Sequence, residues 1–315
     1  MAYYLGIDGG GSKTKCAVGD ENTQLALANA GPTNITRVGR DRARESLHQA
    51  IREACALGRI DPRQIQRACI GVAGAGRAEV ANAVREIVAE VIPGGLQITG
   101  DMEIALAAAF GEGPGVVVIA GTGSIAYGRN ERGQTGRAGG WGFAISDEGS
   151  AQWIGRAAVA GLLRDIDERF KEKSADSAEG SRLFQEMKTA WSLGSFDDFL
   201  RKANSNPDFP ALFPAVVAAH EAGEAVAARV LGEAAEELAR IAGIVTRRLF
   251  RKDDDNPTPV PLAMAGGVFR HSAGLRELFC GEIRRLDLGL VINRQVVEPV
   301  VGALQMARRG FAQAT

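Results

Sequence analysis

The chain alternates short apolar runs with amphipathic segments, and this pattern restarts once. Strands are predicted at residues 3–7, 15–18, 25–29, 68–72, 96–99, 116–120, 125–129 and 260–265, with a short strand-like piece after 133. Helices are predicted at residues 40–57, 79–91, 102–110 and 299–311, and through most of 149–250. This alternation of strands and helices predicts an α/β protein built on central sheets.

Two glycine-rich hairpins open the two halves of the pattern. The first, LGIDGGGSKTKCAVGD at residues 5–20, predicts a strand, a glycine turn and a second strand. Glycines let a bulky anion approach the main chain, and their N–H groups suit a phosphate chain; the competing interpretation is an ordinary hairpin. The polar residues that would join them are Ser12, Lys13 and Thr14. Asp8, at the end of the first strand, is positioned to hold Mg²⁺ through water.

The second hairpin, VVVIAGTGSIAYGR at residues 116–129, again offers glycine and hydroxyl donors, at Thr122, Gly123 and Ser124. It also matches the dinucleotide-binding pattern G-x-G-x-x-A. A dinucleotide-binding turn has to run into a helix, whereas the residues after this turn are strand-like. We therefore predict a second phosphate hairpin.

Asp101 lies between a predicted strand and a predicted helix. One interpretation is a helix N-cap, for which Asp is a preferred residue. The other is a general base at the carboxyl end of a strand, where open α/β sheets gather ligands. One carboxylate can hold both roles, because a capping side chain is already oriented.

Two further segments carry candidate chemistry. Residues 139–151, GGWGFAISDEGSA, combine an aromatic ring, two carboxylates and small residues. Sugars stack on apolar faces and donate hydroxyls to carboxylates, so the segment predicts a pocket wall; the alternative is a turn before a capped helix, with Trp141 in the core. Gly266 and Gly267 end a predicted strand, where they would admit an adenine ring or make a tight turn.

Composition argues against several classes of protein. The 315 residues carry a net charge of −1 without a long run of like charge, so nucleic acid is not an expected partner. No apolar run approaches the roughly 18 residues of a membrane span, and the N-terminus is unlike a secretory signal. The four cysteines are scattered, so we expect buried free thiols in a reduced cytoplasm, and their spacing disfavours a metal or iron–sulfur site.

In this order, the motifs resemble those of the superfamily of sugar kinases, heat-shock protein 70 and actin, from residue 5 to about 307. The resemblance is strongest to the N-acetylglucosamine kinase branch, grouped with the ATPase family that includes activators of benzoyl-CoA reductase and 2-hydroxyacyl-CoA dehydratase. It implies two actin-like, ribonuclease H-like sheet domains with an interdomain cleft. We expect residues 1–114 with 298–315 to form the first domain, and residues 115–297 to form the second, enlarged by helices.

The resemblance also implies roles for individual residues. Asp101 would be the catalytic base, and Asp8 would lie near Mg²⁺. The ATP-binding positions would be Gly10, Gly11, Ser12, Lys13, Thr14, Thr122, Gly123, Ser124, Gly266 and Gly267. The sugar-binding positions would be Asn34, Gly74, Asp101, Thr122, Trp141, Asp147, Ser150 and Ala151.

The implied activity is an ATP- and Mg²⁺-dependent amino-sugar kinase acting on the 6-hydroxyl of N-acetylglucosamine. Glucosamine and N-acetylmuramic acid stay open as acceptors, and the lactyl carboxylate of the latter would need a cation such as Arg37 or Arg77. Two other classes stay open: an ATPase activator that docks a reductase or dehydratase, and a sugar sensor without kinase activity. The activator branch has a Gly-Gly-Gln-Asp segment and a cluster-holding cysteine, whereas this chain has GGWG at 139–142. We expect a homodimer, with residues 184–250 as a candidate interface.

Overall fold

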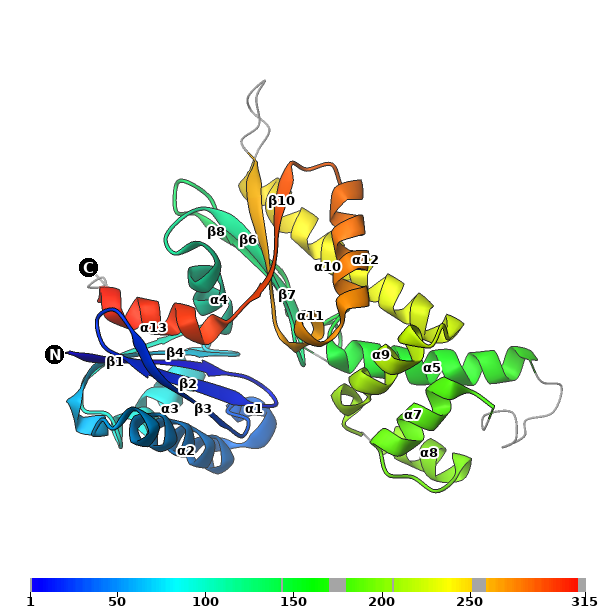
Figure 1. Ribbon diagram of the computed structural model, residues 1–315, viewed down its shortest axis with the longest axis horizontal. Coiled ribbons are helices and arrows are strands. Elements are labelled where there is room, and N and C mark those ends of the chain that lie inside the picture. Colours follow the sequence, from blue (N-terminus) through cyan, green and yellow to red (C-terminus); the bar gives the residue numbers. More distant parts are fainter. Residues whose placement is uncertain (1, 143, 170–179, 206, 251–258, 311–315) are drawn as a thin grey trace. The chain divides into compact units, whose positions relative to one another are not determined.

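The structure, a computed structural model, describes residues 2–142, 144–169, 180–205, 207–250 and 259–310 (Figure 1). The end of the predicted first domain, residues 311–315, lies outside these ranges. The chain forms two compact units: Met1–Val117 with Tyr127–Gln134 and Val297–Thr315, and Val118–Ala126 with Thr135–Val296. No helix in the described ranges is both long and apolar enough to cross a membrane.

The first sheet has the strand order β3-β2-β1-β4-β5. Its strands are β1 (Tyr3–Gly9), β2 (Thr14–Gly19), β3 (Gln24–Ala30), β4 (Ile65–Val72) and β5 (Gly95–Thr99). The predicted first hairpin is confirmed, because β1 and β2 are antiparallel with Asp8 opposite Lys15. Strands β1, β4 and β5 are parallel, and Asp8, Gly71 and Thr99 are in register. The carboxyl ends of these three strands therefore meet at one edge.

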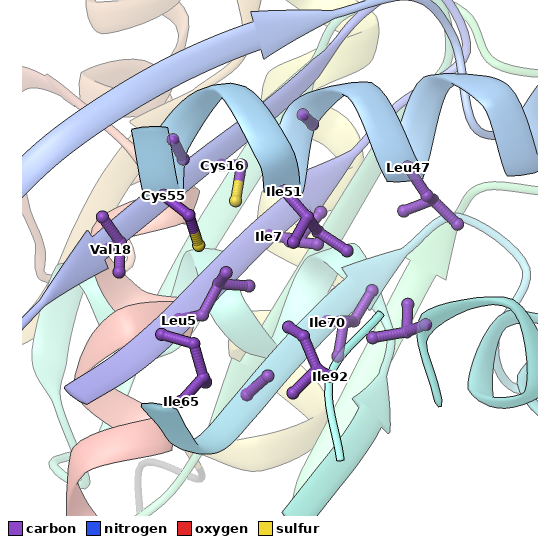
Figure 2. Packing of buried hydrophobic residues seen from close by; sticks show 14 of the residues in the cluster. Leu5, Ile7, Cys16, Val18, Leu47, Ile51, Cys55, Ile65, Ile70 and Ile92 are labelled. Carbon is purple, nitrogen blue, oxygen red and sulfur yellow. The ribbon is translucent and has the colours of Figure 1, made fainter. Parts of the chain in front are cut away.

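Helices cover both faces of this sheet. The longer ones are α2 (Arg40–Gly58), α3 (Ala78–Ala89), α4 (Asp101–Phe110) and α13 (Pro299–Arg309); α1 (Ile35–Val38) and the 3₁₀ turn η1 (Pro62–Gln64) are short. Side chains alternate along a strand, so β1 buries Leu5 and Ile7 in a cluster with Leu47 and Ile51 of α2 (Figure 2). Tyr4 faces the other way, into a cluster with α4 and α13.

Helix α13 lies unusually close to its neighbours because of two glycines. A Cβ atom on Gly6 of β1 would overlap the backbone of Leu304 in α13, and one on Gly302 would overlap the carbonyl oxygen of Ile104 in α4. Any side chain at either position would push the helix away. Helix α13 is therefore packed firmly against β1, the strand that carries Asp8.

The second sheet has the order β10-β9-β6-β7-β8. Its strands are β6 (Gly115–Ala120), β7 (Ser124–Arg129), β8 (Thr135–Gly139), β9 (Val260–Ala265) and β10 (Leu290–Val297). Because β7 is a strand, the rejection of a dinucleotide-binding turn is confirmed. Strand β10 was not predicted; it lies at the sheet edge, where Val291 is largely exposed, and so lacks a continuous apolar run.

The remaining helices follow β8 and β9 in the sequence. They are α5 (Ala151–Arg169), α7 (Arg182–Ala190), α8 (Phe196–Ala203), η2 (Phe209–Leu212), α9 (Phe213–Glu221), α10 (Ala225–Leu249), α11 (Gly267–His271) and α12 (Ala273–Arg285). Two mixed five-stranded sheets with attached helices confirm the predicted α/β class, and the helical enlargement falls in the second unit as expected.

Candidate active site

Asp8 lies at the end of β1 among other charged side chains. Its pKa is raised from 3.8 to about 7, chiefly by burial and then by the neighbouring Asp101 carboxylate. Lys15 and Lys13 act against this rise, while Glu298 adds to it. The first unit thus gathers three carboxylates, those of Asp8, Asp101 and Glu298, and two ammonium groups, those of Lys13 and Lys15. Such a site favours a bound cation, because a cation relieves the repulsion between the carboxylates.

Asp101 is the first residue of α4, and Gly100, not Asp101, is the N-cap. The N-cap interpretation is therefore displaced by one residue. Capping is done by the Glu103 carboxylate, which accepts hydrogen bonds from the Gly100 N–H and, at 3.0 Å, from the Thr99 hydroxyl. One Asp101 oxygen accepts the Met102 N–H at 3.0 Å. Asp101 therefore lies in the first turn of α4, next to the positive end of the helix dipole.

The tip of the first hairpin is a tight turn fixed by main-chain bonds. The Gly10 N–H donates to the Lys13 carbonyl at 3.0 Å, and the Gly10 carbonyl accepts the Thr33 N–H at 3.1 Å. Thr14 is buried, and its hydroxyl donates to the Gly31 carbonyl at 2.7 Å. The Thr14 hydroxyl is therefore part of the internal bonding that holds the turn. Gly11, Ser12 and Lys13 form the outer part of the tip.

Two predicted sugar-binding residues lie beside this tip. Asn34 directly follows Thr33, and its side-chain oxygen accepts the Thr36 hydroxyl at 2.7 Å. Gly74, with a φ of +87°, lies in the loop after β4, which the Ala73 N–H ties to the Gly9 carbonyl at 3.4 Å. The structure therefore brings Asn34 and Gly74 to the same sheet edge as Asp8 and Asp101.

In the second unit, the second hairpin and the segment 139–151 form one structure. The Ser124 hydroxyl donates to the Glu148 carbonyl at 2.7 Å, and the Ala151 N–H donates to the Gly121 carbonyl at 2.8 Å. A Cβ atom on Gly123 would lie 2.7 Å from Asp147 Oδ2. The absence of a side chain at Gly123 thus allows the Asp147 carboxylate to lie against the hairpin, where Thr122 is the central residue.

The backbone of Asp147 has a left-handed conformation, which costs free energy in a residue other than glycine. Asp147 is buried, its φ is +65°, and Oδ1 accepts the Gly142 N–H at 3.2 Å. Burial raises its pKa, and the Gly142 bond partly offsets this effect. Left-handed backbone in a non-glycine residue is concentrated at functional sites. Ser150 has a structural role, because its hydroxyl accepts the Trp153 N–H at 3.2 Å in the first turn of α5.

The diglycine at the end of β9 also adjoins the second hairpin. Gly266 has a φ of +98°, and a Cβ atom there would overlap the carbonyl of Ala120, the last residue of β6. Gly267 begins α11. Thus Thr122, Gly123 and Ser124 lie beside both the diglycine and the Asp147 segment.

Trp141 is not a core residue. Its side chain is 66% exposed, so the interpretation as a turn with a buried tryptophan is wrong in this respect. The Arg137 guanidinium lies over the indole ring, 4.6 Å from its centre. Arg137 was not among the predicted site residues, because nothing in the sequence indicates that a residue of β8 reaches the ring.

Lys15 and Glu298 were also missed. Lys15 could have been found, since the register of a hairpin with a turn at 10–13 places it opposite Asp8. Glu298 is 283 residues from its partner and has no local signal. No cluster of three or more His, Cys, Asp or Glu side chains suited to a metal occurs in the described ranges. Mg²⁺ does not need one, because it retains waters and is held by one or two carboxylates.

Comparison with known proteins adds to this geometry. The model of the BadF/BadG/BcrA/BcrD ATPase family matches residues 5–307. An N-acetylmuramic acid/N-acetylglucosamine kinase of Clostridium acetobutylicum is 34% identical over 284 residues, 89% of each chain. An N-acetyl-D-glucosamine kinase of Dictyostelium discoideum is 26% identical, over 96% of this chain and 97% of that protein.

A solved structure is similar in fold. The crystal structure of a provisional N-acetylglucosamine kinase from Chromobacterium violaceum has a TM-score of 0.74 and 23% identity. The likeness covers 97% of this chain and 98% of that one. It confirms the predicted fold.

Proposed function

The chain belongs to the BadF/BadG/BcrA/BcrD ATPase family, and from this premise we propose that it is an ATP-dependent amino-sugar kinase. The proposed reaction transfers the γ-phosphate of ATP to the 6-hydroxyl of N-acetylglucosamine. The similarity to two amino-sugar kinases along almost the whole chain supports the reaction class. We further propose that the protein acts in the cytoplasm as a homodimer.

The observation that carries the proposal is the proximity of Asp8 and Asp101. Their strands β1 and β5 end at one edge of the first sheet, and each carboxylate is close enough to disturb the other's charge. Phosphoryl transfer to a hydroxyl needs two carboxylates with different tasks, one for the metal and one for the acceptor proton. A binding protein without catalysis needs neither.

In the proposed mechanism, Asp101 accepts the proton of the sugar hydroxyl while Asp8 helps to hold Mg²⁺ through water. When bound, the metal would neutralise charge on the β- and γ-phosphates. The backbone N–H groups at Gly11 and Gly123 would contact phosphate oxygens, Gly10 would shape the turn that presents them, and Lys13 would add positive charge. Phosphoryl transfer depends mainly on positioning and electrostatics, which fits a site built from main-chain turns.

Substrate contacts are proposed on both units. Asn34 and Gly74 would contact the sugar in the first unit, and Trp141 and Asp147 in the second, with Thr122 near both ligands. Gly266 and Gly267 would lie against the adenosine. Glucosamine and N-acetylmuramic acid remain alternative acceptors, because no residue in this proposal depends on the N-acetyl group alone.

An ATPase activator of a reductase is disfavoured. In that branch a cysteine helps to hold an iron–sulfur cluster between subunits, and a thiol in such a position has to reach the surface. All four cysteines of this chain are buried, and burial raises the pKa of each thiol. A thiolate ligand is therefore unfavourable at every one of them.

The test is a coupled ADP-release assay with Mg²⁺-ATP and a panel of acceptors: N-acetylglucosamine, glucosamine, N-acetylmuramic acid, glucose and no sugar. We expect turnover that depends on an amino sugar. ADP release that is equal with and without sugar would contradict the kinase and favour the activator class, for which iron content is the next measurement. No ADP release with any sugar would favour a sensor.

A further inference from the structure

A groove of about 410 Å³ is lined by residues of β8, the loop after it and the C-terminal half of α10, all within the second unit. Its apolar surface comes from Trp141, Ile145, Ile241 and Ile244. Ile145 is 80% exposed and Trp141 66% exposed, which is unusual for large apolar side chains. The volume is within the range of about 300–1,000 Å³ for small-molecule sites.

The groove is electropositive. Three arginines, Arg137, Arg240 and Arg248, line it, against one acidic residue, Glu148. Glu148 accepts the Ser146 hydroxyl at 3.0 Å. The positive charge on the lining therefore exceeds the negative charge, and an anionic ligand is favoured over a neutral one.

The three arginines differ in what they already bind. Arg240 pairs with Glu237 at 2.7 Å, and Arg248 donates to the carbonyl of Arg137 at 2.9 Å. The Arg137 guanidinium has no carboxylate partner in the described part of the chain, and it lies over the indole of Trp141, 4.6 Å from the ring centre. Its planar set of N–H donors matches a carboxylate in shape. Arg137 is thus a positioned cation whose donors are open to a ligand.

The groove is connected to the proposed phosphate hairpin by three residues. The Gly142 N–H, next to Trp141, donates to Asp147, and the other oxygen of Asp147 lies against Gly123. The orientation of the loop that carries Trp141 is therefore set by a residue in contact with the hairpin. A ligand stacked on the indole would lie beside the residues proposed to bind sugar and phosphate.

We propose, resting on the proposed function, that this groove receives acceptor sugars that carry a carboxylate. Arg137 recognises the carboxylate, and Trp141 provides the face on which the sugar ring stacks. Arg137 is a specificity-determining residue that adds a lactyl-substituted amino sugar to the range of acceptors, beside N-acetylglucosamine. Arg37 and Arg77, the cations named from the sequence, belong to the first unit.

A small anionic sugar fits the groove better than an acidic protein does. The apolar surface is limited to one ring and a few aliphatic side chains, whereas a stable protein interface buries about 1,200–2,000 Å². The cation and the ring are also stacked on each other, so that a single ligand can contact both. If the groove instead bound an acidic protein, it would not distinguish one acceptor sugar from another.

The test compares three matched acceptors: N-acetylmuramic acid, its methyl ester and N-acetylglucosamine. The ester has the same ring and substituent but no charge. In Arg137→Gln we expect kcat/KM for N-acetylmuramic acid to fall about 10- to 100-fold, the loss of a charge-assisted hydrogen bond, chiefly through KM. Values for the ester and for N-acetylglucosamine should stay within about twofold. Arg132→Gln, an exposed arginine in the turn before β8, removes the same charge and should change none of them.

Binding is measured in parallel by quenching of tryptophan fluorescence, with Trp141→Phe to assign the signal. Wild type should bind N-acetylmuramic acid more tightly than its ester, and Arg137→Gln should bind the two alike. Equal losses for all three acceptors, or no preference of wild type for the free acid, would overturn the inference while leaving the kinase intact. Failure of the proposed function is recognised separately, by the absence of sugar-dependent ADP release with every acceptor.

Discussion

Lys15 and Glu298 form an ion pair of 2.5 Å that joins strand β2 to the start of helix α13. Lys15 is also the cross-strand partner of Asp8. The lysine side chain is only 16% exposed and the glutamate 38% exposed, so both charges have lost much of their water. Lys15 therefore supplies positive charge beside the proposed metal-binding carboxylate, and its pairing with Glu298 fixes the beginning of α13.

Breaking this pair should destabilise the protein more than removing both partners. We expect Lys15→Met to lower the free energy of unfolding by about 1–3 kcal/mol, because Glu298 and Asp8 then face each other without a counter-charge. The double variant with Glu298→Gln should recover part of the loss, with a coupling energy of about 1 kcal/mol in a urea-denaturation cycle. Strict additivity of the two single losses would show that the pair contributes nothing.

Asp8 should make stability depend on pH in an unusual direction. Its pKa is 3.8 ordinarily and about 7 in the folded protein, so folding takes up a proton between these values. Stability is then greatest at or below about pH 4 as far as this group is concerned, and it falls as the pH rises towards 7.

Asp8→Asn should therefore be more stable than wild type at pH 8 and should lose this part of the pH dependence. Mg²⁺ should stabilise wild type at pH 8, because it compensates the buried Asp8 charge and its repulsion with Asp101, and should not stabilise the variant. Urea midpoints at pH 5 and pH 8, with and without Mg²⁺, measure both effects. Parallel curves for the two proteins would contradict the assignment of Asp8.

The close packing of α13 is tested by comparing alanine substitutions at a crowded helix glycine and at an open one. Gly302→Ala places a methyl group against the carbonyl of Ile104 and should lower the free energy of unfolding by about 1–3 kcal/mol. Gly281→Ala, in helix α12 with open space around it, should raise it by about 0.5–1 kcal/mol. Thermal unfolding of both variants measures the contrast. Equal shifts in Tm would mean that α13 does not lie so close to α4.

Asp101→Asn should lower kcat with N-acetylglucosamine by about 10²–10⁴-fold, the usual effect of losing a general base. The KM values for sugar and ATP should change little, because an amide can still accept a hydrogen bond from the hydroxyl. Glu112→Gln, an exposed neighbour beyond the end of α4, serves as a control and should be fully active. Turnover of Asp101→Asn within a few-fold of wild type would remove Asp101 from the catalytic role.

Local patterns were enough to predict most elements of both sheets. Strands β1, β2, β6 and β7 could be predicted because each pairs with its neighbour across a short glycine turn, and β9 because it is continuously apolar. Strand β10 could not, since an edge strand with exposed side chains on both sides has neither alternation nor an apolar run.

The candidate site was less predictable than the fold, because its contacts are between distant residues. Asp8 and Asp101 were identified from their positions at strand ends, but the Lys15–Glu298 pair depends on how α13 returns to β1. Thr14 and Ser124 were predicted from their hydroxyls, which the structure shows bonded to backbone carbonyls of Gly31 and Glu148. A residue type near a turn does not reveal whether its side chain faces inward.

The central claim, phosphoryl transfer to the 6-hydroxyl of an amino sugar, is tested most directly by a ¹H–³¹P correlation spectrum of the product. The protein is incubated with Mg²⁺-ATP and N-acetylglucosamine, and the sugar fraction is isolated. The account predicts one new phosphorus signal that correlates with the two protons on C6. A phosphorus signal that correlates with the C1 proton, or ADP and inorganic phosphate without any phosphorylated sugar, would contradict it.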